Sequence, residues 1–141
     1  MGRAGRVVAE ALREAGAAVA PGVTTGELDR IVEDVIAASG GIASFKGVPA
    51  IVPGGPAYPA ASCVSVNEEV VHGLPGERVL QAGDIVSVDV GVILDGWHGD
   101  AAITAAVGEI SPEAQHLVEV TRQALMAGIA AARSGGWLFL R

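Results

Sequence analysis

Two aspartates in the segment DIVSVDVGVILDGWHGDAA, residues 84–102, have the types and spacing for metal chemistry. Within this segment Asp95-Gly96 predicts a two-residue hairpin turn, which sets the register of the strands before and after it. In that register Asp89 and Asp100 lie on one face of the hairpin, because strand side chains alternate between faces. They are diagonal neighbours with β-carbons roughly 7–8 Å apart, so both carboxylates can converge on one point.

The surroundings of this pair favour a cation between the two acids. No Lys or Arg occurs between Arg78 and Arg122, so no nearby side chain in the sequence neutralises the pair. Two such acids take up either a proton or a cation, and hard oxygen ligands suit a divalent metal. The residues that share the aspartate face are small and leave room above it: Ser87, Gly91, Ala102 and Thr104.

A solvated strand face is the competing interpretation of the aspartate pair, because surface acids are common. His98 shares the face and is a candidate third ligand, although a lone strand histidine more often only makes hydrogen bonds. His72, between NEEVV and GLPG, is either an exposed histidine or a proton donor held over a substrate amide. Cys63 is expected to be a small buried residue, since no cationic neighbour in the sequence marks it as a nucleophile.

Two helices are predicted ahead of these segments. The first extends to about residue 18 and ends at PGV, residues 21–23, and its apolar residues recur at helical spacing: Val7, Val8, Ala11, Leu12 and Ala15. The second begins at a capping box of Thr24 and Glu27 and closes at Gly40-Gly41. Its apolar stripe consists of Leu28, Ile31, Val32, Val35 and Ile36.

Residues 46–59, KGVPAIVPGGPAYP, are so rich in proline and glycine that they predict a loop. This loop is either a surface connection or the rim of a pocket. After it, SCVSV and VVHG flank NEE and predict a hairpin. The strands IVSVDVGVIL and WHGDAAITAAVG lie before and after the Asp-Gly turn. A last helix is predicted from an N-cap at Ser111, with Pro112 in the first position, to about Arg133.

Composition limits the class of protein. A chain of 141 residues suits one domain, whose core must be aliphatic because only 4% of the residues are aromatic. A net charge of −7 argues against a nucleic-acid or anionic-membrane surface. The single cysteine excludes an internal disulfide and fits a reducing, cytoplasmic location. The apolar stretches are too short to span a membrane, and no internal repeat or convincing domain boundary is evident.

Several segments in this order resemble the N-terminal half of a type I methionine aminopeptidase: AGRVVAEAL, PGVTTGELDRI, SCVSVNEEVVHGLPG and GDIVSVDVGVILDGWHGDAA. The resemblance covers residues 1–133 and implies an α+β fold of the pita-bread type, in which two pseudo-symmetric halves surround a two-metal site. Residues 134–141, SGGWLFLR, depart from the family pattern. The expectation is therefore a fold truncated to its first half, with an aberrant or truncated tail.

The resemblance also implies roles for individual residues. Asp89 matches the aspartate that binds one metal, and Asp100 matches the aspartate that bridges both. His72 matches the catalytic histidine that contacts the substrate near the scissile peptide bond, whereas His98 matches no ligand of the family. The pocket for the methionine side chain would be lined by Phe45, Tyr58 and Cys63. The cofactors would be two divalent ions from among Co, Mn, Fe, Zn and Ni.

The reaction implied is removal of the initiator methionine from nascent polypeptides, with no nucleic-acid or membrane partner and an open oligomeric state. Two departures from the family pattern bear on it. Residues 47–57 look longer and richer in Pro and Gly than the usual loop. The remaining ligands, a histidine and two glutamates, belong to a C-terminal half that this sequence lacks, so impaired activity is expected. The alternatives are a pita-bread peptidase for Xaa-Pro substrates and a non-catalytic binding module.

Overall fold

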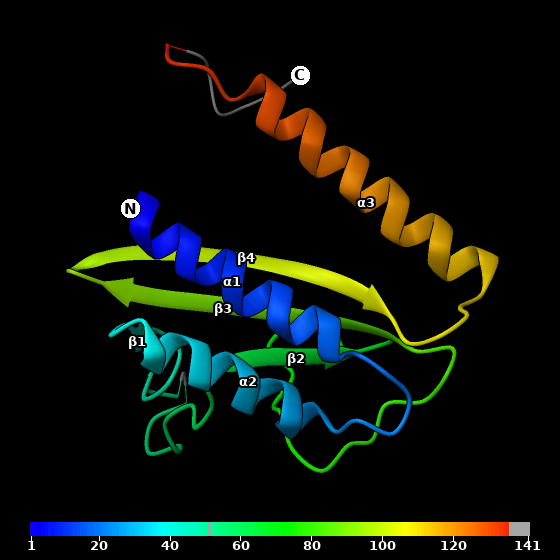
Figure 1. The fold of residues 1–141 in the computed structure, drawn as a ribbon, viewed down its shortest axis with the longest axis horizontal. Helices are drawn as coiled ribbons and strands as arrows, with labels where there is room; N and C mark the ends of the chain where they lie inside the picture. Colours follow the sequence, from blue (N-terminus) through cyan, green and yellow to red (C-terminus); the bar gives the residue numbers. More distant parts are fainter. Residues whose placement is uncertain (51, 136–141) are drawn as a thin grey trace. The chain divides into compact units, whose positions relative to one another are not determined.

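The computed structural model describes residues 1–50 and 52–135 (Figure 1). Its contacts divide the chain into two compact units, Met1–Glu109 and Ile110–Arg141. Each unit is described by itself. Most of the tail predicted to depart from the family pattern, residues 136–141, lies outside the described residues.

Two helices open the first unit, as the apolar repeats predict. Helix α1 spans Gly2–Ala18. Its buried residues are Ala4 and the whole predicted stripe, Val7, Val8, Ala11, Leu12 and Ala15. Helix α2 spans Thr25–Ala38. The predicted capping box is confirmed, because the Glu27 N–H donates to Thr24 Oγ1 at 3.2 Å and the Thr24 N–H donates to Glu27 Oε2 at 2.7 Å. These reciprocal bonds satisfy two donors that the helix start leaves free.

The sheet of this unit is antiparallel throughout and is organised around β3. Strand β4 (Trp97–Ala106) pairs with one edge of β3 (Ile85–Leu94) over its whole length. Along the other edge, β2 (Ser62–Val66) pairs with residues 86–90 of β3, and the two-residue β1 (Ile42–Ala43) pairs with residues 92 and 93. Asp95 and Gly96 have φ values of 51° and 76°, as a turn with two left-handed residues requires. The predicted register is confirmed, with Asp89 opposite Ala102 and Asp100 opposite Gly91.

One predicted hairpin is wrong. Residues 70–73, VVHG, form no strand, and β2 pairs with β3 instead. The turn after β2 is shaped by its own polar side chains. Asn67 adopts a φ of 54° and accepts from the Ile85 N–H at 3.0 Å, and Glu69 accepts from the Val66 N–H at 2.8 Å. The chain after this turn does not continue as a strand beside β2, and the apolar side chains of Val70 and Val71 are exposed.

The two faces of the sheet differ in what covers them. Helices α1 and α2 lie over one face (Figure 1), and against them pack the fully buried side chains of Val86, Val88, Val90 and Val92. Each such valine stabilises the fold by roughly 1.5–3 kcal/mol relative to an exposed one. Because strand side chains alternate, the residues between these valines, including Asp89, face the opposite side of the sheet.

The second unit contains helix α3, Pro112–Ala131. Its start is as predicted, because Ser111 is the N-cap, its Oγ accepts from the Ala114 N–H at 3.1 Å, and Pro112 occupies the first turn. The helix ends two residues before the predicted Arg133, and none of its residues is buried. In the parts of the chain described here, residues 1–50 and 52–135, no helix combines the length and the apolar character needed to cross a membrane.

Candidate active site

All six side chains predicted for the site line a single cavity of about 780 Å³ on the aspartate side of the sheet: Phe45, Tyr58, Cys63, His72, Asp89 and Asp100. They come from five parts of the chain. Asp89 and Asp100 lie on β3 and β4, Cys63 lies on β2 directly opposite Asp89, and the others lie on the connections before and after β2. The tertiary structure therefore gathers the whole predicted set, and the roles of these residues remain predictions.

The two aspartates form the acidic floor of the cavity. They are diagonal neighbours across the β3–β4 ladder, which places their β-carbons roughly 7–8 Å apart. Among the described residues, 1–50 and 52–135, none of those lining the cavity is a lysine or arginine. Gly91, opposite Asp100, leaves space that Phe45 uses, since a β-carbon at residue 91 would lie 2.7 Å from the Phe45 ring. The floor thus combines two hard oxygen donors with the aromatic ring of Phe45 beside them.

The electrostatics of the pair are those of an uncompensated acidic site. Burial raises the pKa of Asp89, the negative charge of Asp100 adds to this effect, and His72 opposes it. A bound cation would relieve the same repulsion, so the donor set fits part of a divalent metal site. Within residues 1–50 and 52–135, however, no group of three or more His, Cys, Asp or Glu side chains is arranged to hold a metal. His98 is exposed on the same face and does not complete such a group.

Cys63 lies beside Asp89 and is buried. Burial raises the pKa of the Cys63 thiol, and the carboxylate of Asp89 raises it further. A thiol in this environment stays protonated at neutral pH and is a poor nucleophile. This agrees with the interpretation of Cys63 as a small buried residue and with a contact role at the cavity wall.

His72 reaches the cavity from an irregular segment and not from a strand end. It has a φ of 58°, a left-handed conformation that is uncommon for a residue with a side chain. The next residue, Gly73, is bonded to β2, where its carbonyl accepts from the Val64 N–H at 2.9 Å and its N–H donates to Ser65 Oγ at 3.0 Å. These contacts place His72 at the rim of the acidic floor.

The loop predicted over residues 46–59 is a wall of the cavity, as the pocket-rim interpretation expected. The base of the loop is closed by two backbone bonds, Gly47 N–H to the Tyr58 carbonyl and Tyr58 N–H to the Val48 carbonyl, both 2.8 Å. Sequence reasoning did not single out the other apolar residues that line the cavity. Six of them belong to this loop and one, Leu74, lies beyond it; the six are Val48, Pro49, Ala50, Pro56, Ala57 and Pro59. Proline density marked the loop, but no local signal showed which way it folds.

Two further residues escaped prediction because their partners are distant in sequence. Asp29 on α2 accepts from the Ser62 N–H at 2.8 Å and from Ser62 Oγ at 2.7 Å, which fixes the start of β2. Ser65 accepts the bond from Gly73. An Asp on a helix and a Ser in a strand are too common for the sequence alone to reveal these pairings.

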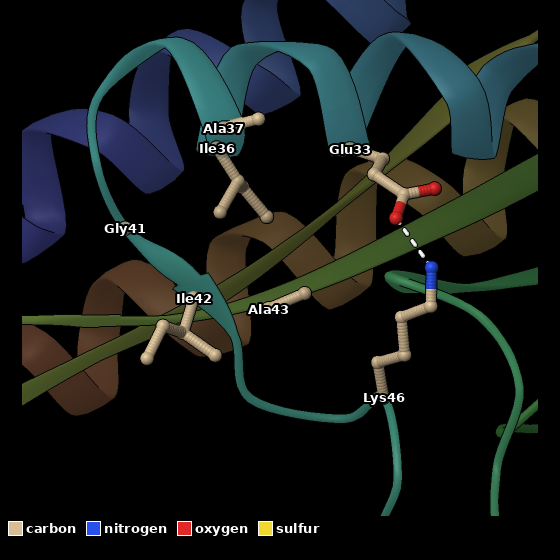
Figure 2. A pocket seen from close by; sticks show the side chains of 7 residues that line it. All are labelled: Glu33, Ile36, Ala37, Gly41, Ile42, Ala43 and Lys46. Atoms are coloured by element: carbon tan, nitrogen blue, oxygen red, sulfur yellow. Dashed lines mark hydrogen bonds and ion pairs between the residues drawn. The ribbon is translucent and has the colours of Figure 1, made fainter.

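A second, smaller cavity of about 270 Å³ lies where α2 meets β1 and has a different character. Figure 2 shows the two charged side chains among its described lining residues, Glu33 from α2 and Lys46 from the chain after β1, pointing toward each other in an ion pair. Its acid is therefore neutralised by a neighbour. In the larger cavity, by contrast, the described lining residues include no lysine or arginine that could pair with Asp89 and Asp100.

Comparison with known proteins identifies the family of this site. Residues 1–137 match Metallopeptidase family M24. The chain belongs to this family. It is 49% identical to the methionine aminopeptidase of Clostridium acetobutylicum, over 98% of this chain and 53% of that relative. It is 52% identical to methionine aminopeptidase 1 of Mycobacterium tuberculosis, over 93% of this chain and 47% of that relative. The M24 chain thus spans about half the length of the curated relatives it matches.

Solved structures confirm the α+β pita-bread fold for this M24 chain. The methionine aminopeptidase of Thermotoga maritima superposes with a TM-score of 0.86 at 44% identity, covering 94% of this chain and 51% of that one. The prolidase of Pyrococcus furiosus superposes with a TM-score of 0.76 at 18% identity, covering 93% and 35%, and shows the fold alone. The coverage of the longer methionine aminopeptidase chain, 51%, fits the expectation that the fold is present in its first half.

Proposed function

We propose that this chain supplies the N-terminal half of a methionyl aminopeptidase site, which removes the first methionine from nascent polypeptides in the cytoplasm. The observation that carries the proposal is the convergence of Asp89, Asp100 and His72 on one cavity with an apolar wall. Its relatives at 46–52% identity are named methionine aminopeptidases. Identity at this level favours the methionine enzyme over the Xaa-Pro alternative, whose fold neighbours share only 17–23%.

Asp89 and Asp100 would hold the metal. M24 metallopeptidases use divalent metals, and we propose two such ions from among Co, Mn, Fe, Zn and Ni, with Asp89 on one and Asp100 between both. Such ions lower the pKa of bound water and polarise the carbonyl that is attacked. Two carboxylates alone give a weak site, because divalent metals in proteins take several ligands. Activity of this chain by itself is therefore expected to be impaired.

The other cavity residues would orient the peptide. His72, at the rim beside the acidic floor, would donate or accept a hydrogen bond at the scissile amide. The methionine side chain would lie among Phe45, Tyr58 and Cys63, against the apolar residues of the loop. A neutral thiol at Cys63 suits this contact role, since a polarizable sulfur packs well in an apolar pocket.

Hydrolysis of the peptide Met-Ala-Ser tests the proposal. The chain is assayed with Mn²⁺ or Co²⁺, alone and joined to the part of the Thermotoga maritima relative that follows the matched region. We expect little hydrolysis by the chain alone and clear metal-dependent hydrolysis by the joined protein, lost on Asp100→Asn. A joined protein that cleaves an Xaa-Pro peptide faster than Met-Ala-Ser contradicts the substrate assignment.

The absence of a third ligand within residues 1–50 and 52–135 favours one other candidate, a binding module without catalysis. Calorimetric titration with Mn²⁺ separates the two. Heat of binding from the chain that disappears in Asp100→Ala supports the metallopeptidase half. No binding by either protein supports the module.

A further inference from the structure

The left-handed backbone conformation of His72 must be stabilised by contacts with other parts of the chain. A left-handed backbone costs conformational free energy for any residue with a β-carbon, so it persists only where the surroundings over-determine it. His72 has a φ of 58° and an exposed side chain. Its own side chain makes no hydrogen bond within the described residues, 1–50 and 52–135. The contacts that stabilise its backbone conformation must therefore be made by its neighbours in the chain.

Gly73, the residue after His72, is fixed by three hydrogen bonds. The Gly73 carbonyl accepts from the Val64 N–H at 2.9 Å and from Tyr58 Oη at 3.1 Å, and the Gly73 N–H donates to Ser65 Oγ at 3.0 Å. The approach is so close that a β-carbon at residue 73 would lie 2.2 Å from the Val64 carbonyl oxygen. Both the N–H and the carbonyl of Gly73 are therefore hydrogen-bonded, to β2 and to the hydroxyl of Tyr58.

Tyr58 is itself anchored. Its Oη is also 3.0 Å from the Ser62 carbonyl, so its single proton is shared between two carbonyls. Ser62 in turn is bonded to Asp29 of α2. Burial raises the pKa of Tyr58, which keeps the hydroxyl protonated as a donor. A chain of bonds thus connects helix α2, the start of β2 and the His72 segment through one hydroxyl group.

We propose that Tyr58 and Ser65 are positioning residues for His72, Tyr58 through the Gly73 carbonyl and Ser65 through the Gly73 N–H, so that the imidazole faces the acidic floor of the cavity. Neither touches the reacting atoms, so both act through Gly73. The inference deepens the proposed function, because the position of His72 matters there only if it serves the scissile amide. Tyr58 then contributes its hydroxyl as well as its ring, which was expected only to line the methionine pocket.

The test uses the metal-free chain in solution, labelled with ¹⁵N and ¹³C. Tyr58→Phe removes one oxygen and keeps the ring, and Ser65→Ala removes the second bond. Two readouts are followed by NMR: hydrogen exchange at the Val64 amide, and the backbone coupling constant of His72, which reports its left-handed conformation. Ser39→Ala is the matched control. It removes a partly buried side-chain hydrogen bond, from the Ser39 hydroxyl to the Ile36 carbonyl, at the end of α2 and outside this segment.

We expect exchange at the Val64 amide to rise about 2- to 12-fold in Tyr58→Phe, the range that follows from one hydrogen bond. The His72 coupling constant should move toward an averaged value in Tyr58→Phe and in Ser65→Ala, and stay unchanged in Ser39→Ala. Adding His72→Gly to Tyr58→Phe should restore protection of the Val64 amide, because glycine adopts the left-handed conformation without strain.

An unchanged His72 coupling constant in both variants would overturn the inference. So would equal acceleration of all sheet amides in Tyr58→Phe without rescue by His72→Gly, since that pattern belongs to a residue that only stabilises the fold. These readouts need neither metal nor substrate. A failure of the hydrolysis assay with the NMR results as expected would therefore reject the proposed function and leave the positioning of His72 intact.

Discussion

The two sides of the cavity are built in different ways. The acidic floor lies on the β3–β4 hairpin, where a continuous ladder of ten residue pairs sets the position of Asp89 and Asp100. The opposite side consists of irregular chain, the loop before β2 and the segment after it, held by a few bonds such as Tyr58 to Gly73. A ladder distributes its stability over many equivalent bonds, whereas the irregular side depends on single contacts. Its residues should therefore be the more sensitive to small changes.

The largest effect is expected from Gly73→Ala on the irregular side. The new β-carbon would lie 2.2 Å from the Val64 carbonyl oxygen, and β2 cannot retreat without breaking its bonds. We expect a loss of about 3–4 kcal/mol in the free energy of unfolding, measured by urea denaturation. The control is Gly76→Ala, where a β-carbon meets no atom within 4 Å. Equal losses in both variants would show that the close approach at Gly73 is not the cause.

The next effect tests the hairpin side. Val88 is fully buried against the helices, so Val88→Ala should cost about 2–3 kcal/mol in lost burial and cavity formation. Its neighbour Ser87 faces the other side, where its Oγ is 2.8 Å from Thr104 Oγ1, and Ser87→Ala should cost less than about 1 kcal/mol. Thermal unfolding followed by circular dichroism gives both values. A larger loss for Ser87→Ala would mean that the two faces are wrongly assigned.

The third prediction concerns the chemistry of the hairpin floor. Asp100→Asn should weaken Mn²⁺ binding by at least tenfold, or about 1.4 kcal/mol, because a neutral amide oxygen is a poorer ligand than a carboxylate. His98→Gln changes a side chain on the same strand and face that lies exposed and outside any ligand group, and should leave Mn²⁺ binding unchanged. Calorimetric titration measures both. Loss of binding in His98→Gln would restore the histidine as a ligand.

The smallest effect is expected where the two regions join. Asp84, just before β3, accepts from the Gln81 N–H and from Asn67 Nδ2, and the Gln81 bond most lowers the pKa of its carboxyl below the ordinary value of 3.8. A carboxyl with a lowered folded-state pKa stabilises the fold above its unfolded value, and this contribution is lost as the pH falls through the folded value. The group lies at the surface and is partly exposed, so at most about 1 kcal/mol is involved.

Asp84→Asn should therefore be less stable than the unmodified chain at pH 6, and the difference should shrink below about pH 4. Urea denaturation at a series of pH values measures this difference. A gap that stays constant from pH 6 to pH 2.5 would show that the ionised carboxylate makes no contribution of its own.

Local sequence determined the hairpin floor almost completely. The Asp95-Gly96 turn sets the register, and alternation along β3 separates the buried valines from Asp89, because both effects act between residues close in the chain. The capping box of α2 and the apolar stripes of α1 and α2 are local in the same sense. Asp89 and Asp100 could therefore be named from the sequence as a candidate metal pair, whereas Phe45, Tyr58 and Cys63 were expected in the substrate pocket only through resemblance to the family.

Tertiary structure decided the other side of the cavity. The valines of VVHG have strand propensity, yet β3 offers its edge to β2, so the predicted hairpin does not form and His72 lies in a left-handed turn. Nothing in the sequence connects Tyr58 with Gly73, or Asp29 with Ser62, because these bonds join segments that meet only after the sheet and helices have packed. The period of the apolar residues determines which face of a helix or strand a residue occupies. Which distant residue it contacts is determined only when the helices and the sheet pack together.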